Sequence, residues 1–195
     1  MRMKVMQPLV AVTLLCAAFA VPAHARQANR TATPAPQLKM TVSGYSDGGD
    51  IPVKYTCAAK ADMVSPMIEW SDAPKDTVSF ALILHDADAH PRKGISDVSH
   101  WIMWNIPATA TQLPEGLKPS DAPMTDGAVQ GKNIRGVDGY AGPCAPPGKP
   151  HHYMYELYAL DTKLDLAPGA SRDDLLKAMD GHIIGKSAYV GMFHQ

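Results

Sequence analysis

Hydrophobic residues in this chain occur in short runs and in strict alternation, a pattern typical of β-strands. Residues 77–85 form an apolar run of strand length, which predicts a central strand buried on both faces. Further strands are predicted at residues 38–42, 51–56, 66–70, 100–106, 151–160 and 182–193. Alternation along residues 100–106 places His100, Ile102, Trp104 and Ile106 on one face of that strand.

Only one segment has clear helical signals, and it lies near the C-terminus. Ser171 is a candidate N-cap with Asp174 three residues later, which resembles a capping box, and Gly181 is a candidate stop. An apolar stripe follows the cap on Leu175, Leu176 and Met179. About eight strands and one helix predict a mainly antiparallel β architecture, and residues 107–141 form a long irregular excursion.

The N-terminus has the features of a cleaved secretion signal, which we expect to span residues 1–25. A positive start precedes the apolar run of residues 9–21, and small residues flank a cleavage site after residue 25. That run is too short to cross a bilayer, so we expect a periplasmic or secreted protein and not an integral membrane protein. Residues 26–37 read as a flexible leader, and residues 38–195 as a single domain.

Charge and cysteine content restrict the function further. The formal net charge of −1 becomes more negative once the signal's two basic residues are removed, which argues against a nucleic-acid partner. The mature chain keeps two cysteines, Cys57 and Cys144. In an exported protein such a pair indicates either a disulfide or two buried thiols, and both readings stay open here.

The candidate chemistry begins where the central apolar run ends. Asp86 and Asp88 are two residues apart, so they share a face if the strand continues. Two close carboxylates can bind a cation, hold histidines in one protonation state, or share a proton. The alternative is a pair of solvated loop aspartates.

Histidines begin two other predicted strands. His100 opens residues 100–106 and is either a site residue or a rim histidine bonded to the backbone. His151 and Tyr153 share a face of residues 151–160, whereas His152 faces the other way. With the two aspartates, such side chains can hold an anion, the carboxylates fixing the imidazole tautomers. Because HExxH, HxH and GxSxG signatures are all lacking, we expect no metal, no cofactor and no serine nucleophile.

Three stretches of the chain resemble motifs of one family. Residues 86–90, DADAH, are similar to the DPDAP motif of phosphatidylethanolamine-binding proteins (PEBPs), and residues 100–107 to the family's histidine-bearing strand. Residues 139–155 are similar to its GYxGPCPPxGxxHxYxF stretch. The chain thus resembles the bacterial Raf-kinase-inhibitor-like branch over nearly all of residues 38–193. Ala87 and His90 stand where the family has prolines.

The resemblance implies an antiparallel two-sheet β-sandwich with a short C-terminal helix. It also implies a small surface pocket for phosphate-like or carboxylate anions, including phospholipid head groups. The residues carried over as pocket walls or neighbours are Asp86, Asp88, His100, His151, Tyr153, Trp101, Tyr140 and Gly142. His90 is an additional side chain beside this pocket, and the family pattern does not predict its role.

Binding of a small anionic or phosphorylated ligand is therefore the function we expect from the sequence. One alternative is an enzyme that uses the Asp/His set for acid–base chemistry on a small substrate. Another, resting on family analogy alone, is an inhibitor of an extracytoplasmic protease acting through residues 107–133. Catalytic activity, a protein partner and a homodimer all stay open at this stage.

Overall fold

The computed structural model describes residues 37–60, 63–94, 96–118 and 126–195. The expected signal and almost all of the expected leader lie outside the described residues, as do residues 119–125 of the irregular excursion. Within the described ranges, no helix is both long enough and apolar enough to cross a membrane.

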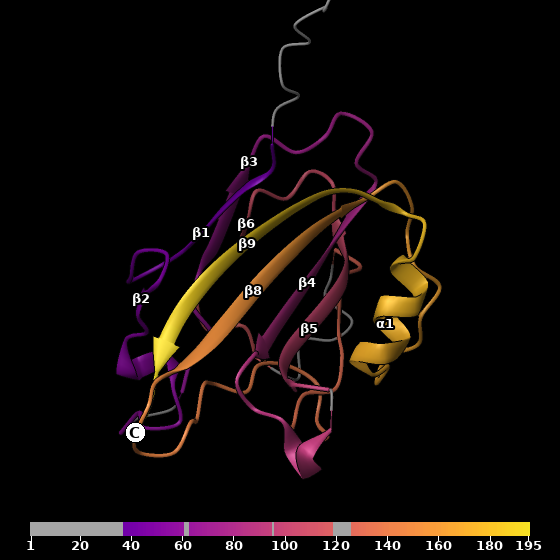
Figure 1. Cartoon of the computed structure of the whole chain (residues 1–195). Coiled ribbons are helices and arrows are strands. Elements are labelled where there is room, and N and C mark those ends of the chain that lie inside the picture. The colour runs from indigo at the N-terminus through magenta and orange to yellow at the C-terminus, as the bar shows by residue number, and fades with distance from the viewer. Residues whose placement is uncertain (1–36, 61–62, 95, 119–125) are drawn as a thin grey trace, which may run out of the picture. The chain divides into compact units, whose positions relative to one another are not determined.

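The larger sheet has six strands, and most pairs of neighbouring strands in it are antiparallel (Figure 1). Its order is β2 (Gly49–Asp50), β9 (Ile183–Phe193), β8 (His151–Leu160), β4 (Ser79–Asp86), β5 (Val98–Pro107) and β7 (Val129–Gln130). The β2–β9 pair is parallel. Strand β4 lies between β5 and β8 and is buried along its whole length, as the apolar run predicts.

The smaller sheet has three strands, and short helices complete the fold. The sheet order is β1 (Lys39–Val42), β3 (Ile68–Ser71) and β6 (Gln112–Leu113). The helices are η1 (Val53–Tyr55) and η2 (Pro91–Lys93), both 3₁₀, and the α-helix α1 (Arg172–Met179). The predicted mainly β, two-sheet fold with one short α-helix near the C-terminus is confirmed for the described part of the chain.

Two hydrophobic clusters lie on opposite faces of the six-stranded sheet. The first fills the space between the sheets and includes Met40, Trp70, Leu82, Leu84, Trp101 and Tyr155. The second packs beneath α1 and includes Ala81, Ile83, Ile102, Trp104, Leu175 and Met179. Because side chains alternate along β4, this single strand supplies both clusters.

The N-terminus of α1 has the predicted capping box. Ser171 Oγ accepts a hydrogen bond from Asp174 N at 3.2 Å, and Asp174 Oδ2 accepts one from Ser171 N at 3.0 Å. These bonds satisfy two backbone donors that the first turn of a helix leaves free.

The expected strand at residues 51–56 is wrong, because this segment contains η1. Pro52 has a φ of −55°, which suits the start of a helical turn, and its carbonyl accepts from Tyr55 N at 2.9 Å. Thr56 Oγ1 donates to Val53 O at 2.9 Å and closes the same turn. Local hydrogen bonds therefore replace a strand ladder here.

The prediction that side chains alternate strictly along β5 is also wrong, because two irregularities interrupt the pairing of β5 with β4. Leu84 pairs with Trp101 but the next residue, His85, pairs with Ser99, which leaves His100 as an extra residue. Such a bulge redirects the side chain. The His100 ring lies against Tyr153 in the first cluster, whereas Ile102 belongs to the second.

Candidate functional site

Polar side chains from three strands meet at one end of the six-stranded sheet. Asp86 is the last residue of β4, His100 lies near the start of β5, and His151 begins β8. The antiparallel register aligns these ends, pairing Asp86 with Tyr153 and with Val98 (lower end of the sheet in Figure 1). Residues distant in sequence therefore form one polar cluster, which we call the Asp86 cluster (Asp86, His100, His151 and Tyr153).

Asp86 and His151 form a close pair in this cluster. His151 Nδ1 lies 2.8 Å from Asp86 Oδ2 and 3.1 Å from Oδ1, while Asp88 N donates to Oδ1 at 3.0 Å. A carboxylate only accepts hydrogen bonds, so Nδ1 of His151 carries a proton. Nε2 is then the nitrogen left for a ligand, and the Asp86 carboxylate fixes that arrangement.

Asp88 belongs to a separate pair nearer the surface. Strand β4 ends at Asp86, so the continued strand that would place both carboxylates on one face does not exist. Asp88 Oδ2 instead accepts from His152 N at 2.7 Å and lies 2.8 Å from His152 Nδ1. The backbone N–H of His152 holds the pKa of Asp88 below its usual value. Each aspartate therefore holds its own histidine.

His100 is a buried histidine with a defined tautomer. Its Nδ1 lies 2.8 Å from Ala141 O, and because a carbonyl only accepts, Nδ1 is the donor. Burial lowers the pKa of His100 by disfavouring the charged ring, although the Ala141 carbonyl and Asp86 act in the opposite direction. The neutral ring thus keeps Nε2 as an acceptor.

Tyr153 lies edge-on to His100, with ring centroids 5.2 Å apart, and is completely buried. Its hydroxyl oxygen accepts from Cys144 N at 3.1 Å, which leaves the phenolic O–H to donate elsewhere. Burial raises the pKa of Tyr153, and the nearby charge of Asp86 raises it further. Tyr153 is therefore a neutral donor next to the carboxylate.

The other three residues predicted near the pocket, Trp101, Tyr140 and Gly142, are buried in the protein. Trp101 is fully buried, donates to Gln130 Oε1 at 2.7 Å and contacts the Tyr140 ring edge-on. Tyr140 Oη donates to Tyr55 O at 2.6 Å. A Cβ at Gly142 would lie 2.6 Å from that same carbonyl oxygen, so a side chain does not fit there. These contacts connect them with one another, with Tyr55 and with Gln130.

Cys57 and Cys144 form a disulfide, with their Cα atoms 5.3 Å apart. A backbone bond from Cys57 N to Pro143 O at 3.0 Å runs beside it. Of the two readings that the sequence left open, the structure has the bonded one.

His90 has no hydrogen bond to the Asp86 cluster among the described residues. It is exposed and precedes η2, where its carbonyl accepts from Lys93 N at 3.2 Å. Within the described residues its imidazole makes no hydrogen bond or ion pair.

A second polar network, which sequence reasoning missed, lies on the α1 side of the same sheet. His85 Nδ1 is 2.5 Å from Asp97 Oδ2, and His85 Nε2 is 3.6 Å from Glu156 Oε2. Arg172 pairs with Asp97, and Lys186 Nζ lies 2.5 Å from Glu156 Oε1. The available signal was Glu156 itself, a charged residue inside a strongly apolar strand.

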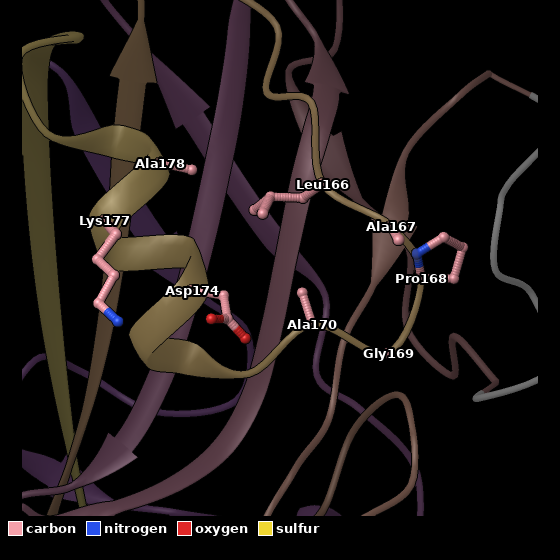
Figure 2. A pocket seen from close by; sticks show the side chains of 8 residues that line it. All are labelled: Leu166, Ala167, Pro168, Gly169, Ala170, Asp174, Lys177 and Ala178. Atoms are coloured by element: carbon pink, nitrogen blue, oxygen red, sulfur yellow. The ribbon is translucent and has the colours of Figure 1, made fainter.

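A hollow of about 570 Å³ lies between α1 and the loop before it (Figure 2). Apart from Asp174 and Lys177, its lining is aliphatic, proline or glycine. Asp174 is already engaged by Ser171 in the capping box. This hollow lacks the imidazole and phenol donors that gather at the Asp86 cluster, which makes the cluster the stronger candidate for polar ligands.

The described ranges contain no group of side chains arranged to bind a metal ion. No group of three or more His, Cys, Asp or Glu side chains there could hold an ion. The carboxylates and imidazoles are instead arranged as hydrogen-bonded pairs.

Known proteins resemble this chain in both sequence and fold. A family model described as phosphatidylethanolamine-binding protein matches residues 41–194. A UPF0098 protein of Methanothermobacter thermautotrophicus is 40% identical over 158 residues, covering 81% of this chain and 99% of that protein. The solved structure of a PEBP homolog from Chlamydia trachomatis is 35% identical, with a TM-score of 0.72. That of Escherichia coli YbcL, described as a new member of the mammalian PEBP family, is 28% identical, with a TM-score of 0.73.

In both comparisons, the matched region covers 82% of this chain and 99% of the chain in the solved structure. The family model and the M. thermautotrophicus relative both extend over most of the described domain. The chain belongs to the phosphatidylethanolamine-binding protein family, in agreement with its motifs.

Proposed function

We propose that this protein binds a small anion, such as phosphate, a carboxylate or a phospholipid head group, at the Asp86 cluster. The observation that carries the proposal is the His151–Asp86 pair. The carboxylate occupies Nδ1 of His151 and leaves Nε2 for a ligand. When that imidazole is protonated, its Nε2–H is a charge-assisted donor, the strongest kind for an anionic oxygen.

The exposure of the pair favours an anion despite the negative charge of Asp86. The His151 side chain is 22% exposed, whereas that of Asp86 is 5% exposed. An approaching ligand therefore meets the imidazole before the carboxylate. The carboxylate charge is also partly balanced, because Asp86 accepts from both His151 and Asp88 N.

We further propose that the protein acts outside the cytoplasm. Residues 1–25 have the sequence features of a secretion signal. The Cys57–Cys144 disulfide supports this proposal, because disulfides persist mainly in oxidising compartments.

Isothermal titration calorimetry with inorganic phosphate, phosphoethanolamine and acetate tests the binding proposal. We expect binding of at least one of them, and a loss of roughly tenfold or more in affinity in His151→Ala, as for a charge-assisted bond. Tighter binding of phosphoethanolamine than of phosphate would indicate a head group, and tight acetate binding a carboxylate ligand.

His182→Ala is a matched control for this experiment. Nδ1 of His182 lies 2.9 Å from Asp161 Oδ1, so this variant also removes an aspartate-paired imidazole, but from outside the Asp86 cluster. Its affinity should equal that of the wild type. No binding of any of the three anions at millimolar concentration, or equal losses in both variants, would refute the proposal.

A further inference from the structure

The segment 140–145 supplies main-chain groups to the Asp86 cluster. Ala141 O accepts from His100 Nδ1 at 2.8 Å, and Ala141 N donates to His100 O at 2.8 Å. Cys144 N donates to the Tyr153 hydroxyl oxygen at 3.1 Å. This segment therefore fixes the tautomer of His100 and engages the hydroxyl oxygen of Tyr153, two members of the Asp86 cluster.

The same segment has no strand or helix of its own between residues 141 and 145, so its position depends on a few cross-links. Three of them lead to residues 55–57. Tyr140 Oη donates to Tyr55 O at 2.6 Å, Cys57 N donates to Pro143 O at 3.0 Å, and the Cys57–Cys144 disulfide is the covalent link. Cys144 is at once bonded to Cys57 through its sulfur and to Tyr153 through its backbone N–H.

We infer that the Cys57–Cys144 disulfide is a positioning bond for the anion site, so that its reduction weakens ligand binding while both sheets remain folded. This inference rests on the proposed function. Cys144 is exposed and Cys57 is partly exposed, so a small reductant reaches the bond. Neither cysteine lies in a strand of either sheet, which is why the sheets do not depend on the bond for their pairing.

The reduction uses a dithiol reagent as the electron donor. The S–S bond breaks, and each cysteine sulfur takes up one electron and one proton. The reagent gives up these two electrons and two protons and closes its own disulfide. Of its three links to residues 55–57, the segment then keeps only the two hydrogen bonds, beside its bonds to His100 and Tyr153.

Calorimetry with phosphate and phosphoethanolamine measures the effect on the purified chain, oxidised and dithiol-reduced, beside a Cys57→Ser/Cys144→Ser variant. Circular dichroism at the titration temperature confirms that the sheets are folded. We expect at least fivefold weaker binding in the reduced protein and in the variant, and no response of the variant to reductant. Gln195→Ala is the control, because it removes an amide nitrogen that lies 3.5 Å from both sulfurs but leaves the disulfide and the backbone bond from Gln195 N to Ala145 O in place.

A ligand-independent measurement separates positioning from simple stabilisation. Burial, the largest influence, lowers the pKa of His100, whereas the hydrogen bond to the Ala141 carbonyl raises it. If reduction releases the segment, the ring loses both its burial and this hydrogen bond. Because burial is the larger influence, the pKa of His100, followed by NMR, should rise toward its usual value. Unchanged affinity together with an unchanged pKa would overturn the inference. If neither form binds an anion, the proposed function fails, and the NMR titration still decides whether the bond positions His100.

Discussion

Replacing Glu156 by glutamine should reveal how much the second polar network stabilises the fold. The Glu156 carboxylate lies 2.5 Å from Lys186 Nζ and 2.8 Å from Tyr158 Oη, with His85 Nε2 at 3.6 Å. Burial by itself raises the pKa of Glu156, but its interactions with His85, Lys186 and Tyr158 lower it from 4.5 to about 2. A gap of this size corresponds to about 3 kcal/mol of folding free energy.

The sign of the pH dependence follows from the lowered pKa. The folded carboxylate holds its charge more strongly than the unfolded one, so the full stabilisation is present above about pH 4.5. It is lost as the pH falls from there toward the folded pKa of about 2. Glu156→Gln should therefore be less stable than the wild type by about 3 kcal/mol at pH 7 and nearly equal to it at about pH 2.

Urea unfolding followed by tryptophan fluorescence at several pH values between 7 and 2.5 measures this difference. Asp161→Asn is the control, because the Asp161–His182 pair is exposed at 47% and 46%. An exposed pair contributes little, so this variant should differ from the wild type by less than about 1 kcal/mol. A gap between wild type and Glu156→Gln that stays constant with pH would refute the reasoning.

Two further predictions concern the surroundings of the Asp86 cluster. Gly142→Ala should destabilise the fold by about 2 kcal/mol in urea unfolding, because the new Cβ would lie 2.6 Å from Tyr55 O and 2.4 Å from the Met63 sulfur; an unchanged midpoint would contradict this. Because burial lowers the pKa of His100, the unfolded chain binds the proton more readily, and stability should fall as the pH drops below about 6.5. The decrease in Tm between pH 7 and 5 should be smaller in His100→Gln, and an equal decrease would argue against a buried neutral ring.

The sequence predicted correctly the elements whose signal is local or does not depend on which strand lies beside them. Strand β4 is buried on both faces, so its apolar run needed no knowledge of its partners. The capping box of α1 is likewise a local signal, complete within Ser171 and Asp174. The strand prediction for residues 51–56 is wrong because Pro52 and Thr56 favour a local turn over extended backbone.

The position of His100 could not be derived from periodicity. Counting faces along a strand assumes that each residue has one partner, and the bulge in β5 adds a residue without changing the pattern of polar and apolar side chains. His100 is that extra residue, and its ring lies against Tyr153. The family motif identified His100 as a candidate site residue. The direction of its side chain follows only from the pairing of β4 with β5.

The two aspartates show why a motif alone does not determine the role of a residue. Asp86 and Asp88 have the same side chain and stand two positions apart, but β4 ends between them. Asp86 is 3% exposed and holds His151, whereas Asp88 lies in the following turn and holds His152 through both its backbone and its ring. The partner thus decides whether a carboxylate fixes an inner or an outer imidazole, and the role proposed for Asp86 rests on its own partner, His151.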